Sequence, residues 1–217
     1  PDLAMIRRLV RVGLPAAGEQ MLLSGGILMF SRVVTTLGTI SFAAHQITTN
    51  ITSLSWMPAF GYSLATAALV GQSLGKRDPE LAAAYARTAW RQVVLLTGGL
   101  ALTFLLFGRP IARLYTRDRE VIALAALSMR VGAVSLPAGG AYSVLAGALR
   151  GAGDTRWPLY ITFIAVWTVR LTISYFTGLV LGWGLAGIWF GVTCDQLVRA
   201  LLAELRFRSG RWQNLQV

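Results

Sequence analysis

Ionisable side chains are scarce in this sequence. Only 13% of its residues are charged and 55% are apolar, whereas water-soluble domains carry about 25% charged residues. No Asp, Glu, Lys or Arg occurs between Arg32 and Lys76, or between Arg170 and Asp195. A helix that crosses a bilayer needs about 20 mostly apolar residues. The scarcity of charge excludes a water-soluble protein and predicts an all-α integral membrane protein.

Cysteine and histidine each occur once, as Cys194 and His45. A single thiol forms no disulfide within the chain, and a single imidazole cannot complete an HExxH site or a His-rich metal cluster. These absences exclude the common hydrolase and metal sites, so we expect no enzyme and no cofactor.

Clusters of Gly, Pro and charge divide the chain into six apolar stretches, which we interpret as transmembrane helices. The 43 uncharged residues after Arg32 would make a helix of about 64 Å at 1.5 Å per residue, so we expect a turn at residues 36–39. Asp78, Asp118 and Thr155 are expected to begin helices. The six predicted spans cover residues 10–36, 42–72, 88–108, 122–148, 158–181 and 184–204, and residues 205–217 are expected to form a basic tail.

Basic residues outnumber acidic ones, and the net charge is +11. If the N-terminus faces the cytoplasm, twelve of the 20 Lys and Arg residues lie near cytoplasmic span ends, four lie near outer ends, and four lie within or at the edge of spans. The positive-inside rule then places both termini in the cytoplasm. We therefore expect a multi-pass protein of the cell's inner (plasma) membrane, whose basic loops adjoin the lipid bilayer and bind no nucleic acid.

Glu19 is an acidic residue about nine positions into the first predicted span, which is roughly 14 Å deep at the helical rise. Pro15 lies one turn earlier, where it removes a backbone hydrogen bond and can kink the helix. The first span has no basic residue three or four positions from Glu19, so we expect an isolated carboxyl. Such a residue either exchanges a proton or a cation during transport, or is a protonated or hydrogen-bonded structural acid packed between helices.

Arg170 and Asp195 are the two charges that border the last long uncharged stretch. The Gly-Trp-Gly turn at residues 182–184 makes the fifth and sixth spans antiparallel, and each of the two residues lies about 11 positions from that turn. The same depth on adjacent helices predicts an ion pair, with Arg199 as a competing partner one turn from Asp195. We interpret this intramembrane pair as structural, with a role in ion coupling as the alternative.

Polar residues also recur at helical spacing in the second span. Gln46, Asn50 and Ser53 form one stripe, which either faces a cavity and contacts a ligand or binds a neighbouring helix. Tyr142 on the fourth span is a weaker candidate of the same kind. Pro137 is expected to bend that span.

Two pairs of glycines have the small-xxx-small spacing of closely packed membrane helices. They are Gly147 with Gly151, and Gly187 with Gly191. Since glycine lets helix backbones approach one another, we expect both pairs to lie at helix contacts and to bind no ligand.

Several sequence strings occur together in an order typical of one family. They are GLPAAGE at residues 13–19, AAHQI at 43–47, LVGQSLG at 69–75, GALRGAGDTR at 147–156, and GIW at 187–189 followed by Asp195. In order and spacing the chain resembles multidrug and toxic compound extrusion (MATE) transporters over nearly its whole length.

The resemblance implies a twelve-helix transporter of two six-helix lobes, of which this chain is the C-terminal lobe. Its partner would be the N-terminal lobe or a second copy of the chain. The implied activity is export of small organic compounds, often cationic, in exchange for H⁺ or Na⁺. Glu19 would then bind the coupling ion, and Gln46, Asn50 and Tyr142 would line the substrate cavity.

The resemblance also bears on the coupling ion. In one branch of the family the acid of the first span lies one turn further on, where this chain has Leu23, and the fourth span supplies a second acid. Residues 122–148 contain no Asp or Glu. We therefore favour H⁺ over Na⁺, although Na⁺ could bind at Glu19.

Two other functions fit the same architecture. One is a flippase for lipid-linked oligosaccharides, whose cavity needs several cationic residues to hold a pyrophosphate. The other is a membrane scaffold that transports nothing. Export of a fluorescent cationic dye, dependent on an H⁺ or Na⁺ gradient, would distinguish the exporter from both.

Overall fold

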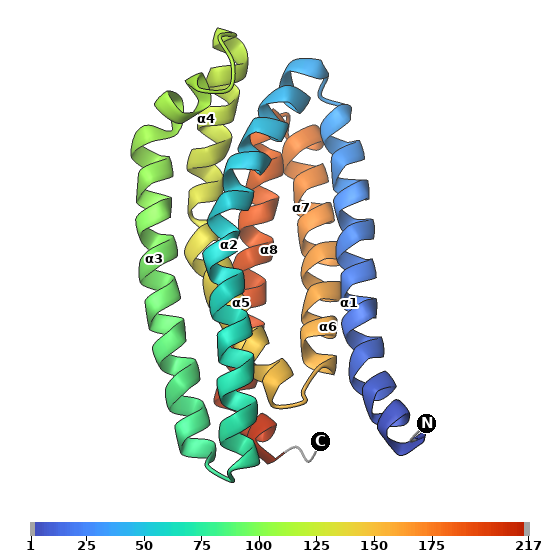
Figure 1. The fold of residues 1–217 in the computed structure, drawn as a ribbon. Coiled ribbons are helices and arrows are strands. Elements are labelled where there is room, and N and C mark those ends of the chain that lie inside the picture. The colour runs from blue at the N-terminus through green and yellow to red at the C-terminus, as the bar shows by residue number, and fades with distance from the viewer. Residues whose placement is uncertain (1–2, 215–217) are drawn as a thin grey trace.

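The computed structural model describes residues 3–214, and within them every regular element is helical (Figure 1). The predicted all-α fold is thus confirmed for the described residues. The elements, in chain order, are α1 (Leu3–Thr35), α2 (Thr39–Gly75), α3 (Pro79–Arg113), α4 (Arg119–Ala133), α5 (Ser135–Gly151), α6 (Arg156–Phe163), the π-helix η1 (Ile164–Arg170), α7 (Leu171–Tyr175), the π-helix η2 (Phe176–Val180), α8 (Gly184–Arg208) and the 3₁₀-helix η3 (Arg211–Asn214).

The boundaries between helices follow from local sequence chemistry. The first turn lies where it is predicted, and Gly38 has a φ of 89°, a backbone conformation that glycine adopts at no steric cost. Asp78 accepts a hydrogen bond from the Leu81 N–H and caps α3, and Asp118 caps α4 in the same way. Thr155 directly precedes α6, where the sequence predicts a helix start, although its side chain makes no capping bond.

Among the described residues, three helical stretches are long and apolar enough to cross a membrane: α3, residues 156–180, and α8. A fourth is added if α4 and α5 form one span, although they are bent by 48°. The predicted span 122–148 is therefore not a straight helix. The bend lies at Val134, three residues before Pro137, which has no N–H to offer the carbonyl of Ala133. Six spans remain a prediction.

The helices form one bundle in which α1 packs mainly along residues 156–175, while α2, α3, α4, α5 and α8 pack on one another (Figure 1). The main apolar core includes Phe30, Ile51, Phe104, Met129 and Trp189. Large apolar side chains are also exposed on the outside of the bundle; Met21 is 75% exposed and Leu95 is 77% exposed. An apolar exterior of this kind matches a lipid-facing surface.

Both ends of the described chain lie at the same end of the bundle (Figure 1). The predicted basic tail differs from the structure, because residues 205–208 continue α8 and η3 folds back against the bundle. The Trp212 side chain is buried, and its indole N–H donates to the Phe207 carbonyl oxygen at 2.8 Å. Apolar burial of this tryptophan therefore holds the segment in place. Residues 215–217 lie outside the described part.

The loop between α5 and α6 is tied to α8 by charge. Asp154 lies 2.7 Å from an Arg206 nitrogen, and both side chains are mostly buried. The same guanidinium lies over the Trp157 ring, 4.8 Å from its centroid. The last residues of the GALRGAGDTR string therefore join the α5–α6 connection to α8, at the end of the bundle that carries the termini.

Both glycine pairs lie at close helix contacts, as predicted. A Cβ atom on Gly147 would be 2.4 Å from the Ser63 carbonyl oxygen, and one on Gly151 would be 2.2 Å from that of Ala67. These two glycines let α5 pack directly on α2. A Cβ on Gly191 would be 2.1 Å from the Ser174 hydroxyl, so the second pair lets α8 approach residues 171–180.

Replacing Gly151 with Ala is expected to destabilise the fold by about 1–3 kcal/mol, because the backbone of α2 must move away from the added methyl group. Gly61→Ala is the matched control. Gly61 also lies within a helix but has no atom within 4 Å of the added carbon, so this change should be neutral or stabilise by up to about 1 kcal/mol. Thermal unfolding in detergent measures both, and equal melting temperatures for the two variants would contradict the close contact.

Candidate functional site

Glu19 lies inside the bundle and is not the isolated carboxyl that the sequence predicts. Its side chain is only 7% exposed, and Arg150 Nη2 lies 2.9 Å from Oε1 and 3.1 Å from Oε2. Arg150 belongs to the last turn of α5, and the residues are 131 positions apart. The prediction of an unpaired acid is wrong because the partner comes from a distant helix.

Two hydroxyl groups complete the surroundings of this carboxylate. Tyr142 from α5 and Thr162 from α6 each donate to Glu19 Oε1 at 3.2 Å. The two hydroxyl oxygens are 3.1 Å apart, and both side chains are buried. Hydrogen bonds to a charged carboxylate are stronger than those between neutral groups, so three helices meet at Glu19.

The two members of the Glu19–Arg150 pair differ in their access to solvent. The Arg150 side chain is 36% exposed, compared with 7% for Glu19. A long arginine side chain can keep its charged end near water while its stem lies against apolar surface. If the pair opens, Arg150 can therefore be solvated outside the bundle, whereas Glu19 stays inside.

Asp195 forms the second buried acidic centre. Arg170 Nη2 lies 2.6 Å from Oδ2 and Arg199 Nε lies 2.9 Å from Oδ1, so both residues named in the sequence analysis contact it. The Asp195 side chain is 0% exposed, and the two arginines are 13% and 5% exposed. A carboxylate in such surroundings needs these partners, since a buried charge without one costs several kcal/mol.

Arg199 links the two acidic centres. Its Nη1 lies 3.5 Å from the Thr162 hydroxyl, and its guanidinium carbon lies 5.2 Å from the centroid of the Tyr142 ring. We use the name carboxylate network for the seven residues that these contacts join: Glu19, Tyr142, Arg150, Thr162, Arg170, Asp195 and Arg199.

The carboxylate network contains three arginines and two acids, which gives a net charge of +1 when all five are ionised. Arg170 contributes one unmet donor, because its buried Nε has no hydrogen-bond partner among the described residues. Arg130, which is exposed on α4, is not part of the network and does not add to this charge. Positive charge is therefore in slight excess where the acids are buried, and any proton or cation that reaches Glu19 must compete with a guanidinium.

The three candidates for a substrate cavity do not come together in the described bundle. Gln46 and Asn50 are exposed on α2, whereas Tyr142 is only 8% exposed and belongs to the carboxylate network. Ser53 is also exposed, and its hydroxyl donates to the Asn50 carbonyl oxygen. Tyr142 is thus placed to act on Glu19, and the polar stripe of α2 lies on the outside of the lobe.

The backbone at Pro15 is part of α1, but its side chain lies outside the described residues, so the predicted kink stays a prediction. Within the described part, no group of three or more His, Cys, Asp or Glu side chains could hold a metal ion. The only protein oxygens that bond to the Glu19 carboxylate there are those of Tyr142 and Thr162.

Arg150 and Thr162 are the members of the network that sequence reasoning missed. Tyr142 and Arg150 are eight residues apart, a spacing that puts them on the same side of a helix. That spacing could have connected Arg150 with Tyr142, but nothing in the sequence shows that α1 packs against this side of α5.

A family model described as MatE matches residues 15–176. The chain belongs to this family, whose members are membrane transporters and not enzymes. The resemblance noted in the sequence is thereby confirmed.

Several curated relatives carry transporter names. The chain is 34% identical over 217 residues to the probable multidrug resistance protein NorM of Thermotoga maritima, covering 100% of the chain and 47% of that protein. It is 33% identical over 215 residues to the multidrug resistance protein MdtK of Yersinia pseudotuberculosis, covering 96% of the chain and 46% of that protein. The chain therefore spans about half the length of these relatives.

Solved structures share the fold at low sequence identity. The Vibrio cholerae MATE transporter VcmN in the bent form superposes with a TM-score of 0.91 at 19% identity, over 99% of this chain and 49% of that one. A MOP superfamily transporter from Pyrococcus furiosus, reported with a reverse polarity of its binding pocket, gives a TM-score of 0.87 at 20% identity over 96% and 47% of the two chains. The helical arrangement is thus that of a MATE transporter, over about half of each solved chain.

Proposed function

We propose that this chain is the C-terminal six-span lobe of a two-lobe exporter of small organic, often cationic compounds, driven by H⁺ entry. Membership of the MatE family and the names of the relatives support export. Coverage of about half of each relative supports a second lobe or a second copy as partner. The observation that carries the proposal is the buried Glu19 carboxylate, paired with an arginine that can reach solvent.

In this proposal, a proton and the Arg150 guanidinium compete for the Glu19 carboxylate. A proton that binds Oε2 neutralises the carboxylate and weakens its attraction to Arg150. Arg150 then turns toward water or lipid headgroups, while the Tyr142 and Thr162 hydroxyls keep Glu19 in place. Loss of the proton restores the ion pair. The α1–α5 contact therefore has two states, and the coupling ion selects between them.

The surroundings of Glu19 support H⁺ as the coupling ion. Na⁺ would need several oxygen ligands, and its charge would lie beside Arg150 and close to Arg199. A proton needs only one carboxylate oxygen. The excess of positive charge in the carboxylate network thus favours H⁺, with Na⁺ at Glu19 as the alternative.

The exposed polar stripe of α2 is the proposed substrate surface. Gln46 and Asn50 lie on a helix that has no charged residue between Thr39 and Gly75, and polar side chains are unfavourable toward lipid. In an aqueous cavity between this lobe and a second lobe, water can hydrogen-bond to both side chains. Alternating access by motion of one lobe against the other needs such a facing surface.

The membrane topology is part of the same proposal. Six spans, both termini in the cytoplasm and a location in the plasma membrane agree with the termini at one end of the bundle (Figure 1) and with the distribution of basic residues. The turns at residues 36–38, 76–78, 114–118, 152–155 and 181–183 separate the six proposed spans.

A lipid-linked oligosaccharide flippase is the second candidate function. The observation in its favour is the network's three arginines against two acids, because cationic side chains can hold a pyrophosphate. Each of the three arginines is already paired with an acid, so the exporter is the better supported of the two.

Cells that express the complete protein are expected to expel a fluorescent cationic dye, and a protonophore should stop the export. Dye retention in cells is measured by fluorescence with and without the protonophore, and cells with an empty vector are the control. Export that continues after the H⁺ gradient is lost but stops without Na⁺ would reverse the assignment of the ion. Absence of gradient-dependent export would count against the exporter and favour the flippase or a scaffold.

A further inference from the structure

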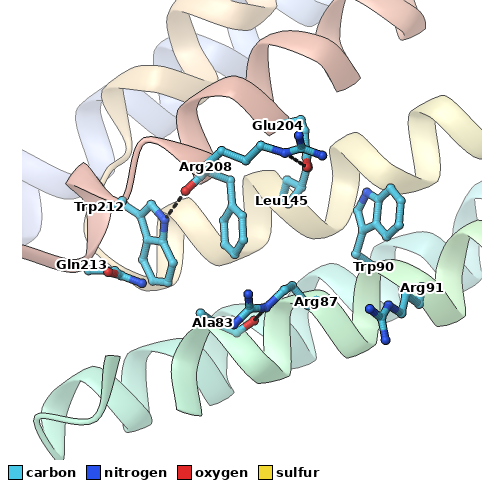
Figure 2. Close-up of a pocket in the computed structure, with 11 residues that line it drawn as sticks. Ala83, Arg87, Trp90, Arg91, Leu145, Glu204, Arg208, Trp212 and Gln213 are labelled. Carbon is cyan, nitrogen blue, oxygen red and sulfur yellow. Dashed lines mark hydrogen bonds and ion pairs between the residues drawn. The ribbon is translucent and has the colours of Figure 1, made fainter. Parts of the chain in front are cut away.

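A cavity of about 490 Å³ lies between α3 and α8 at the end of the bundle where η3 folds back (Figure 2). Its lining residues include Arg87, Trp90 and Arg91 of α3, Arg208 of α8 and Trp212 of η3. None of these residues belongs to the carboxylate network. The cavity is therefore a second polar site, formed by other residues than those of the carboxylate network.

The cavity has an excess of positive charge. Three arginines line it, and Glu204 is the one acid among its described lining residues. Glu204 Oε1 accepts from Arg208 Nε at 2.6 Å, which neutralises that arginine. Arg87 and Arg91 form no ion pair with any carboxylate among the described residues; the Arg87 Nε donates only to the Ala83 carbonyl oxygen. Two guanidinium groups thus remain available to an anion.

Apart from Gln213 and Gly210, the remaining lining residues of the cavity are apolar or aromatic. The Trp212 and Phe207 rings stack with centroids 4.9 Å apart. Because the Trp212 N–H is already bonded to the Phe207 carbonyl oxygen, the two rings offer only carbon surface to the cavity. Leu145 of α5 also lines it. A ligand that fits needs both a negative group and an apolar part.

A second, apolar groove adjoins this cavity at Trp90. Its volume is about 470 Å³, it shares Trp90 with the cavity, and all its lining residues are apolar. It follows α3 from Trp90 to Leu105, which is about 22 Å at the helical rise. One leaflet of a bilayer has a hydrocarbon depth of roughly 15 Å. The groove is therefore long enough for an acyl chain, and the charged cavity adjoins its Trp90 end, on the side of the chain termini.

We propose that the cavity and the groove together bind one anionic phospholipid, with its phosphate at Arg87 and Arg91 and an acyl chain along α3. Both α3 and α8 are long and apolar enough to cross a bilayer, so their ends lie at headgroup level. Arginine and tryptophan at that level are the side chains that contact lipid phosphates and the membrane interface. The cavity and the groove are lined by α3, α4, α5, α8 and η3, and lipid binding there is independent of ion coupling at Glu19.

The test is a titration of the purified protein in detergent, followed by native mass spectrometry that counts bound lipid. Dioleoyl phosphatidylglycerol is expected to bind more tightly than dioleoyl phosphatidylcholine, which has no net charge. The double variant R87Q/R91Q should bind phosphatidylglycerol about 30-fold more weakly. The matched control R113Q/R117Q removes the same charge from exposed positions at the opposite end of α3, and should bind like the unchanged protein.

Three results would overturn the proposal. Equal affinity for the two lipids would show that charge is not recognised. If R87Q/R91Q and R113Q/R117Q lost the same affinity for phosphatidylglycerol, the effect would be due to the overall charge of the protein and not to this cavity. Inorganic phosphate that displaces phosphatidylglycerol at equal concentration would show a site for soluble phosphate, whereas a preference for dioleoyl over dihexanoyl phosphatidylglycerol supports the groove.

Discussion

Glu19→Gln is expected to reduce gradient-driven dye export by the complete protein to the level of cells without it. Glutamine keeps the size of the side chain and can accept the hydrogen bonds of Tyr142 and Thr162, but it neither takes up a proton nor pairs with Arg150. Because Arg150 is 36% exposed, its loss of a partner leaves a charge that water can solvate. The variant should therefore be expressed and folded normally.

Glu120→Gln is the matched control for this experiment. Glu120 is an exposed acid in the first turn of α4, and its neutralisation should leave export unchanged. Dye efflux and the amount of folded protein in the membrane are measured for both variants. A Glu19→Gln protein that exports at the normal rate would remove Glu19 from the coupling mechanism, even if the chain is an exporter.

Asp195→Ala is expected to have the largest effect on folding, a loss of about 3–5 kcal/mol of stability. This change leaves Arg170 and Arg199 in the bundle without their carboxylate, and their side chains are only 13% and 5% exposed. Arg170→Ala alone should cost less, because Asp195 keeps its bond to Arg199. The yield of monodisperse protein in size-exclusion chromatography measures these effects.

The double variant R170A/D195A distinguishes an ion pair from two independent contributions. It should fold better than Asp195→Ala alone, but not as well as the unchanged protein, because Arg199 still lacks its partner. The exposed pair Arg208–Glu204, with side chains 75% and 29% accessible, is the control, and its alanine variants should differ from additivity by about 0.5 kcal/mol or less. If the losses at Arg170 and Asp195 add in full, the pair contributes no net interaction.

The sequence identifies features that depend on neighbouring residues or on a short connection. The caps at Asp78 and Asp118 are local, since each acts within its own first helical turn. The proximity of Arg170 and Asp195 follows from the short turn at residues 182–184, because a tight hairpin sets the register of its two helices. The glycine contacts are recognised by their spacing of four, which places both residues on one side of a helix.

Features that depend on packing between distant segments cannot be recognised from local sequence patterns. The Glu19–Arg150 pair joins residues 131 positions apart, and a positive-inside count treats Arg150 only as a loop charge. The cavity between α3 and α8 likewise forms only where α3, α8 and η3 meet, and the sequence shows no more than basic residues in each of these segments. The stretch from Arg156 to Val180 gives no sequence signal for its two π-helical segments, since its apolar pattern would suit a continuous α-helix.

These two π-helices, η1 and η2, limit how this stretch can rotate. A π turn holds more residues than an α turn, so rewinding η1 into an α-helix would swing every side chain beyond it around the helix axis. Arg170 is the last residue of η1, and its bond to Asp195 fixes its direction. The ion pair therefore sets the angular position of residues 171–180, including the Ser174 and Thr177 hydroxyls that bond to carbonyl oxygens of α8.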